Sequence, residues 1–216
     1  MDNHVSMPEE DPADAGPPAE GPAPRTRRPL PHHRRHWRAA ASRIKVEPVS
    51  GFDGMMQVVA IRAVVYMGEM GTDYGKGFDG NDFAATHLLA TVDGEPAGCI
   101  RIRYFGDFAT PERMAVLPRF RTQRFGARGV AHALGQAAFE HCARKGYRTV
   151  IGHAKADLVR FWSSFGVFVP ANKEGARWGD HEIVPMIGQV EPPDDAVRLD
   201  SDVATILARE GNWDHA

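Results

Sequence analysis

The feature that most constrains this chain is a strand, a turn and a helix that follow one another within residues 111–147. A short apolar run at 114–117 precedes a turn rich in arginine and glycine, and a long helical segment follows that turn. The first backbone N–H groups of a helix have no partners inside it, and the helix dipole adds partial positive charge there. Glycine lets a ligand approach the backbone, and arginine offers paired donors to phosphate oxygens. The segment therefore predicts a phosphate-binding site where the turn meets the helix.

Strand-like and helix-like segments alternate on both sides of this site. Apolar runs and turn signals predict strands at 44–48, 86–92, 96–105, 114–117, 148–152, 167–169 and 183–187. The length of an almost continuous apolar run favours a helix at 55–67, and amphipathic patterns predict helices at 129–145 and 158–165. Asp93-Gly94 is a hairpin signal that makes the early strands antiparallel, and the strand–helix–strand order after residue 114 predicts a parallel crossover. Together the pattern indicates a mixed α/β sheet.

Composition narrows the class of protein further. A hydrophobic content of 43% over 216 residues is enough for one folded core, and a net charge of -2 gives no overall attraction to nucleic acid or to anionic membrane. The two cysteines, Cys99 and Cys142, are too few for a disulfide framework or a cysteine-rich zinc site. No apolar run approaches the roughly 18 residues that a membrane span needs, and no secretory signal is visible, so we expect a cytoplasmic protein.

The two ends of the chain differ from the middle. Half of the 16 prolines lie between Pro8 and Pro31, and an acidic stretch there is followed by a basic run rich in arginine and histidine. Such a segment cannot bury enough apolar area to offset its ordering entropy. We therefore expect a disordered tail at 1–42, a folded domain at 43–190 and a surface-wrapping extension at 191–216. The basic run is a solvated tail or a contact for RNA, anionic lipid or an acidic partner.

The strand and turn resemble those of the GNAT superfamily of N-acyltransferases. Arg113-Met114-Ala115-Val116-Leu117-Pro118, followed by Arg121, is similar to the family's central strand and its exit. In that family the strand binds the pantetheine arm of acyl-CoA, and a turn of the form [Q/R]-x-x-G-x-[G/A] holds the pyrophosphate. The resemblance therefore implies that Met114, Ala115 and Val116 hold the cosubstrate.

Two registers of the turn compete for the pyrophosphate. Arg121-Thr122-Gln123-Arg124-Phe125-Gly126 has the usual spacing from Pro118, but arginine stands at the first glycine position. Gly126-Ala127-Arg128-Gly129-Val130-Ala131 keeps the Gly-x-Ala ending at the helix start, but it begins with glycine. We favour the second register, and the predicted cosubstrate ligands of the turn are Arg121, Arg124, Gly126, Ala127, Arg128, Gly129, Val130 and Ala131.

Three further segments resemble the family, and the resemblance spans roughly residues 46–190. His153-Ala154 followed by Phe161-Trp162-Ser163-Ser164-Phe165-Gly166 is similar to its late F-Y-x-x-x-G-F signature, the hairpin at 93–98 to its early hairpin, and IRAVVYMGEM at 61–70 to a helix with R-x-x-V-F-x-x-E-Q. The resemblance implies a GNAT-like, mostly antiparallel central sheet flanked by helices.

The chemistry implied is transfer of an acyl group from a thioester to an amine, which needs a base and an oxyanion site but no metal. Glu112, just before the central strand, is the first candidate base, and the alternative is an ion pair with Arg113 or a surface arginine. His153 is the second candidate, and the alternative is a histidine at the core edge. Trp162 stands where many members carry a tyrosine acid, so Tyr104 or direct release of the thiolate would have to replace it.

The resemblance implies an acyl-CoA-dependent N-acyltransferase, with acetyl-CoA as the family's common cosubstrate, acting on a small amine or an exposed amino group. The alternatives are a non-catalytic acyl-CoA sensor and an enzyme similar to acyl-homoserine-lactone synthases. Asp79, Asn81, Asp82 and His87 form a polar cluster that is first a turn signal and second a candidate for amine recognition. We expect no membrane or nucleic-acid partner for the folded domain, and a homodimer is one assembly compatible with the sequence.

The two registers make opposite predictions for two valine variants. If the motif is Gly126–Ala131, Gly129→Val blocks CoA binding, whereas in the other register Gly126→Val is the damaging change. CoA affinity of the two variants, with folding checked by circular dichroism, decides between them. If both folded variants bind CoA like the parent protein, the turn is not the phosphate site.

Overall fold

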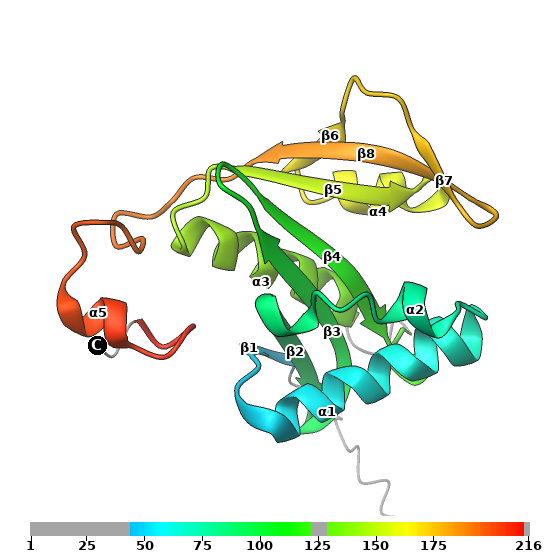
Figure 1. Cartoon of the computed structure of the whole chain (residues 1–216), viewed down its shortest axis with the longest axis horizontal. Coiled ribbons are helices and arrows are strands. Elements are labelled where there is room, and N and C mark those ends of the chain that lie inside the picture. Colours follow the sequence, from blue (N-terminus) through cyan, green and yellow to red (C-terminus); the bar gives the residue numbers. More distant parts are fainter. Residues whose placement is uncertain (1–43, 122–128, 214–216) are drawn as a thin grey trace, which may run out of the picture. The chain divides into compact units, whose positions relative to one another are not determined.

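A computed structural model describes residues 44–121 and 129–213, and all structural statements here concern those residues. Their strands form one sheet in the order β1-β2-β3-β4-β5-β8-β6, with β7 paired to β8 (Figure 1). The strands are β1 Ile44–Pro48, β2 Thr86–Val92, β3 Glu95–Tyr104, β4 Ala109–Val116, β5 Thr149–Lys155, β6 Phe168–Pro170, β7 Ala176–Trp178 and β8 His181–Gln189. The helices are α1 Gly51–Arg62, η1 Ala63–Glu69, α2 Tyr74–Gly77, η2 Asp82–Ala84, η3 Pro118–Phe120, α3 Gly129–Arg144, η5 Ala156–Leu158, α4 Val159–Ser163 and α5 Val203–Leu207.

The predicted mixed sheet is confirmed. Every pairing in the sheet is antiparallel except that of β4 with β5, which α3 connects. The hairpin between β2 and β3 turns at Asp93 and Gly94, whose φ angles are 51° and 86°. A two-residue hairpin with positive φ at both positions matches the right-handed twist of its strands, which explains why Asp-Gly predicted this turn correctly.

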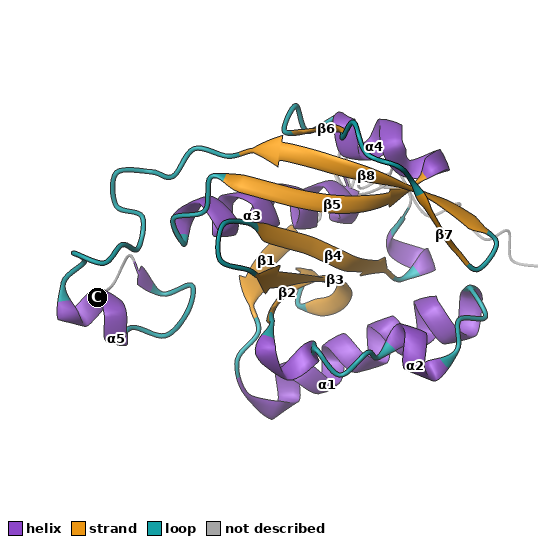
Figure 2. Ribbon diagram, turned by 45° about the horizontal axis from the view of Figure 1, so that its top comes forward, coloured by secondary structure: helices purple, strands orange, loops and turns teal. Residues whose placement is uncertain are grey.

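Helices cover the two faces of the sheet (Figure 2). Ile100 and Ile102 of β3 face α3 in the main core, whereas Cys99 packs with Val58 and Ile61 of α1 in a second, smaller core. This division follows from the two-residue period of a strand, which sends alternate side chains to opposite faces. The predicted helix at 55–67 is confirmed as α1, which continues into the wider turn of η1.

Strand β4 bends away from its neighbour near the middle of the sheet. Arg101 of β3 pairs with Glu112 and Cys99 pairs with Ala115, so two residues of β4, Arg113 and Met114, stand opposite one residue of β3. This is a β-bulge, and the φ of Arg113 is 54°. Strands β4 and β5 pair at Ala109 and Val150 and then diverge (Figures 1 and 2).

The C-terminal extension attaches to the folded domain through specific contacts. The division of the chain into a domain at 43–190 and an extension at 191–216 stays a prediction. The Val197 N–H donates to the carbonyl of Arg144 at 2.8 Å. Glu210 Oε1 accepts hydrogen bonds from Thr86 Oγ1 at 2.6 Å and Lys145 Nζ at 2.8 Å, and lies 2.9 Å from His141 Nε2. The tail at 1–42 lies outside the described residues. None of the described helices is long and apolar enough to cross a membrane.

Glu210→Gln is expected to destabilise the domain near neutral pH. Burial acts to raise the pKa of Glu210, but hydrogen bonds from His141 and Lys145 outweigh it and hold the pKa below its usual value. A carboxylate with a lowered folded-state pKa stabilises the fold above its unfolded pKa and loses this contribution as the pH falls. Loss of the charged acceptor should cost about 1–3 kcal/mol, a decrease in Tm of about 3–8 °C.

Thermal unfolding of the variant and the parent from pH 7 down to pH 3 measures this effect. The difference in Tm should shrink below about pH 4, where the Glu210 carboxyl group of the unfolded parent begins to bind a proton that the folded carboxylate does not bind. Glu191→Gln is the matched control, because Glu191 pairs with Arg148 on the exposed surface and such pairs contribute about 0–1 kcal/mol. Equal destabilisation by both variants would contradict the prediction.

Candidate active site

A buried arginine organises the sheet beside the β4 bulge. Arg101 of β3 is 0% exposed. Its Nη1 and Nη2 each lie 2.7 Å from one carboxylate oxygen of Asp79, and its Nε and Nη2 donate to Glu112 Oε1 at 3.1 and 2.8 Å. Nη1 also donates to Asp82 Oδ1 at 3.0 Å. A buried charge is tolerated when it is paired and hydrogen-bonded in this way.

A second buried arginine completes the cluster from α1. Arg62 donates to Asp82 Oδ1 and to the carbonyl of Gly77. His87 Nε2 lies 3.0 Å from the carbonyl of Asp82, and burial lowers the pKa of His87. Hydrogen bonds from Arg101 hold the pKa of Asp79 far below its usual range. The polar residues predicted as a turn therefore also hold the segment after α2 against the sheet.

Glu112 keeps one carboxylate oxygen outside this cluster. Both bonds from Arg101 reach Oε1, and Arg103 Nη1 lies 3.8 Å from the same atom. Oε2 has no hydrogen-bond partner among the described residues, and the side chain is 23% exposed. The sequence left open a pair with Arg113 or a surface arginine; the arginine bonded to Glu112 is instead the buried Arg101. The arrangement leaves a fixed carboxylate with one oxygen able to accept a proton.

Arg113 connects the bulge to both neighbouring segments. Its Nη2 donates to Asp79 Oδ2 at 3.1 Å, and its guanidinium carbon lies 4.4 Å from the ring centroid of Trp178 in β7. Trp178 gives no signal in the sequence, because β7 is a three-residue exposed strand without a periodic pattern. The position of Arg113 in a bulge gives no signal either, since a bulge cannot be predicted from apolar periodicity.

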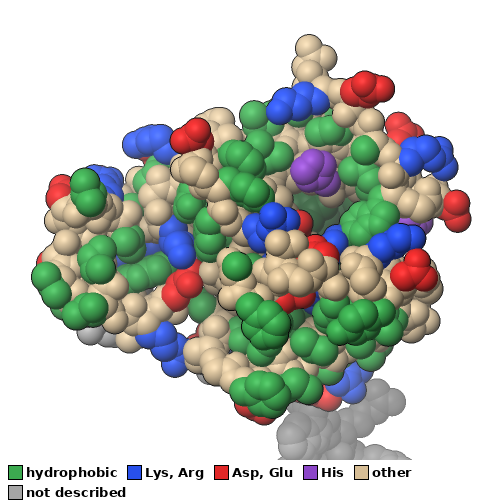
Figure 3. All heavy atoms as spheres, in the orientation of Figure 1, with side chains coloured by type: hydrophobic (Ala, Val, Ile, Leu, Met, Phe, Trp, Pro, Cys, Tyr) green, Lys and Arg blue, Asp and Glu red, His purple; other side chains and the backbone are tan. Residues whose placement is uncertain are grey.

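The predicted strand at 148–152 ended before His153. In the structure, His153 lies inside the longer strand β5. It is exposed and pairs with Pro185 of β8. Lys155, two residues on and therefore on the same face, places Nζ 3.1 Å from His181 Nε2. In the orientation of Figure 1, the space-filling view shows a hollow between β4 and β5, with a histidine and Lys or Arg side chains near its rim (Figure 3).

The main chain of β4 after the bulge presents hydrogen-bonding groups away from β3. The Leu117 N–H donates to Ala97 at 2.9 Å, in the same register as the pair of Ala115 with Cys99. Alternate residues of an antiparallel strand point their N–H and C=O groups to opposite sides, so those of Val116 point away from β3. Arg121 Nε already donates to the Val116 carbonyl at 2.8 Å.

The remaining predicted cosubstrate residues take varied positions. The Met114 carbonyl accepts from the Tyr66 hydroxyl at 3.0 Å, and burial raises the pKa of Tyr66 to about 12. Arg121 forms a two-point ion pair with Glu69 of η1. Gly129, Val130 and Ala131 open α3, with Gly129 at a φ of 53°. Arg124, Gly126, Ala127 and Arg128 lie outside the described residues.

Neither Trp162, which stands at the family's tyrosine position, nor Tyr104, the possible substitute acid, is free to protonate a leaving group. Trp162 lies in a cluster of rings with Phe139, Phe161, Phe165 and Phe168. The Tyr104 hydroxyl donates to Thr86 Oγ1 at 2.9 Å. Burial raises the pKa of Tyr104, and its ring stacks on that of Tyr147. Release of the thiolate without a tyrosine acid therefore becomes the simpler hypothesis.

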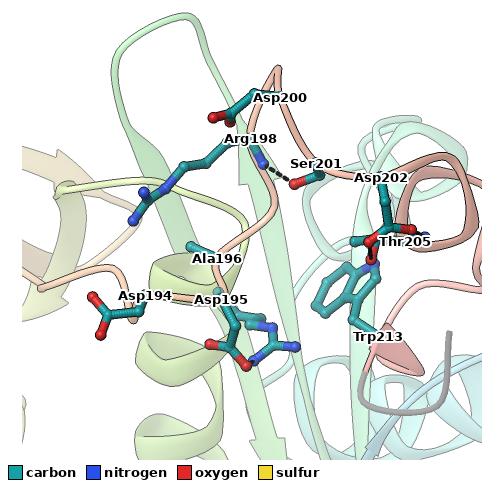
Figure 4. Close-up of a pocket in the computed structure, with 10 residues that line it drawn as sticks. Asp194, Asp195, Ala196, Arg198, Asp200, Ser201, Asp202, Thr205 and Trp213 are labelled. Atoms are coloured by element: carbon teal, nitrogen blue, oxygen red, sulfur yellow. Dashed lines mark hydrogen bonds and ion pairs between the residues drawn. The ribbon is translucent and has the colours of Figure 1, made fainter.

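A separate pocket of about 580 Å³ lies along the C-terminal extension (Figure 4). Its lining residues are Arg144, Asp194, Asp195, Ala196, Arg198, Asp200, Ser201, Asp202, Thr205 and Trp213. Asp202 accepts from the Thr205 N–H at 2.8 Å and so caps α5, and the Ser201 hydroxyl accepts from the Arg198 N–H at 2.8 Å. These bonds organise the loop itself, and none of the catalytic candidates lines this pocket.

Comparison with known proteins agrees with the predicted family and fold. Residues 65–167 match a family model described as the acetyltransferase (GNAT) family. No curated protein sequence matches the chain. A solved structure of an N-acetyltransferase from Lactobacillus plantarum is similar over 68% of this chain and 98% of its own, with 17% identity and a TM-score of 0.60.

Two further solved structures share the fold. Escherichia coli ElaA is similar over 68% of this chain and 99% of its own, with 20% identity and a TM-score of 0.57. Arabidopsis thaliana Naa50, solved with the bisubstrate analogue CoA-Ac-MVNAL, is similar over 67% of this chain and 97% of its own, with 16% identity and a TM-score of 0.52. The family model and this shared fold therefore identify a GNAT acetyltransferase domain at residues 65–167 of the chain.

Proposed function

We propose that the protein transfers an acyl group, acetyl in the first instance, from acyl-CoA to the amine of a small molecule. The observation that carries the proposal is the divergence of β4 from β5 at a bulge beside Glu112. The Val116 N–H is available along the diverging edge for the pantetheine arm, and the first turn of α3 supplies N–H groups for the pyrophosphate. Arabidopsis thaliana Naa50, which has a similar fold, was solved with a CoA-containing bisubstrate analogue, and this supports acyl-CoA as the cosubstrate.

Glu112 is the base in this proposal. A neutral amine attacks the thioester carbonyl, and Glu112 Oε2 removes the amine's proton directly or through water. The bonds of Arg101 to Oε1 hold the carboxylate in place, so little orientational freedom remains to be lost during reaction. His153 is the second candidate, since its side chain is exposed on β5 and histidine transfers protons well near neutral pH.

The leaving thiolate is stabilised by main-chain donors in this proposal. Trp162 and Tyr104 are both engaged elsewhere, and Tyr66 donates to the Met114 carbonyl. A CoA thiolate is a good leaving group, so N–H donors on the β4 edge can substitute for a general acid. A cytoplasmic location stays a prediction.

A non-catalytic acyl-CoA sensor is the second candidate, favoured by the packing of Trp162 where many family members carry a tyrosine acid. Turnover of labelled acetyl-CoA against a panel of amines separates the two. Binding of CoA without any turnover would favour the sensor.

CoA or acetyl-CoA is expected to raise the Tm of the protein. A ligand that binds the folded state alone stabilises it by about 2.7 kcal/mol at a hundredfold excess over Kd. Differential scanning fluorimetry with a CoA titration measures the shift, and adenosine at equal concentration controls for base stacking. No shift at millimolar CoA would overturn the acyl-CoA proposal.

Glu112→Gln is expected to lower kcat by about 10²–10⁴-fold and to change the KM for acetyl-CoA little, because the amide keeps the size and loses the proton acceptor. Steady-state kinetics with circular dichroism as a folding check measure this. Arg101 retains Asp79 and Asp82 as partners in the variant, so its charge stays compensated. His153→Gln is the comparison, and a larger loss there would transfer the role of base to His153.

A further inference from the structure

The charges around the β4 bulge have an excess of cations. Four guanidinium groups, those of Arg62, Arg101, Arg103 and Arg113, meet three carboxylates, those of Asp79, Asp82 and Glu112. All three guanidinium nitrogens of Arg101 donate to these carboxylates, and the two terminal nitrogens of Arg62 donate to Asp82 and to the Gly77 carbonyl. The excess of positive charge therefore belongs to the arginines at the edge of the cluster.

Arg113 keeps unused donors at this edge. Of its three guanidinium nitrogens, Nη2 alone has a hydrogen-bond partner among the described residues, and Nε is buried without one. Trp178 stacks against the group and restricts its orientation. An arginine held flat by an aromatic ring, with donors to spare, is suited to binding an oxyanion.

A second cation, Lys155, lies near Trp178 on the side of β5, β7 and β8. Trp178 and His181 are directly paired residues of β7 and β8, so their side chains share one face of the hairpin. His181 Nε2 lies 3.1 Å from Lys155 Nζ on β5. Arg113, Trp178, His181 and Lys155 thus form a continuous line across β4, β7, β8 and β5, and we call these four residues the basic wall.

From the basic wall we infer that the acceptor is a small amine that also carries an anionic oxygen group, a carboxylate or a phosphate, and that Arg113 and Lys155 bind this group. The inference rests on the proposed acyl transfer. A cationic site also favours the neutral form of the attacking amine over its ammonium form, which the chemistry requires. Polyamines, which carry several positive charges, are disfavoured by the same wall.

The test compares matched acceptors with acetyl-CoA, following release of the CoA thiol. The panel holds α-, β- and γ-amino acids beside their primary amides, phosphoethanolamine beside ethanolamine, and spermidine. We call the amines that carry a carboxylate or a phosphate acidic amines, and the matched amides and ethanolamine their neutral partners. We expect kcat/KM for an acidic amine to exceed that of its neutral partner at least tenfold, which corresponds to about 1.4 kcal/mol. The amino-acid and phosphate arms identify which oxyanion is preferred.

Variants connect this preference to the wall. Arg113→Gln and Lys155→Gln should each raise the KM for the acidic amine about tenfold or more and leave the KM for its neutral partner within twofold. Lys155 is partly exposed, so its variant should fold even if that of Arg113 does not. Arg119→Gln is the matched control, because Arg119 pairs with Glu95 on the exposed surface.

The outcomes separate the inference from the proposed function. Turnover with equal or greater preference for neutral amines or spermidine overturns the inference and leaves acyl transfer standing. If no amine is acetylated, acyl transfer fails, and Tm measurements on the CoA complex then decide the inference. Extra stabilisation by acidic amines that is lost in Lys155→Gln supports an anion site, and no such stabilisation overturns it.

Discussion

The pairing of Arg101 with three carboxylates is the interaction on which the candidate site depends. Arg101 comes from a central strand and has no exposure to solvent, so its charge must be compensated within the protein. Asp79, Asp82 and Glu112 supply this compensation from two separate parts of the chain. As a result, one guanidinium group fixes both the segment after α2 and the carboxylate beside the bulge. Arg101 therefore couples the stability of this region to the geometry of the site.

The bulge in β4 turns this cluster into a site. An unbroken ladder between β4 and β5 would use the main-chain groups of Val116 within the sheet. With the extra residue, β4 bends, β5 separates from it, and those groups become available to a ligand. The positive φ of Arg113 belongs to the same distortion. The Arg113 side chain contacts Asp79 on one side and Trp178 on the other. These contacts to two other elements compensate the local backbone strain.

The two ends of the site use different chemistry. On the β3 and β4 side, charges are buried, paired and fixed, which suits a base that must be positioned before reaction. On the β5, β7 and β8 side, Lys155, His181 and Trp178 are more exposed and are linked by single contacts. Such a surface can adjust to an acceptor. Trp162 packs with the rings of Phe139 and Phe165, and this packing takes it out of proton transfer.

The sequence by itself determined the order and type of most elements. The alternation of apolar residues and the Asp93-Gly94 turn depend on local geometry alone, so β2 and the β2–β3 hairpin matched their predictions, and α1 and α3 differed by a few residues at most. The motif order also predicted the GNAT family, and it singled out Glu112 before any contact was known. Tertiary structure decided what lies around that carboxylate. The partnership of Glu112 with Arg101, the Trp178 stack and the attachment of Glu210 join residues that are distant in sequence or carry no periodic signal. Contacts of this kind arise only when the chain folds, because they depend on which strands become neighbours and where one of them bends.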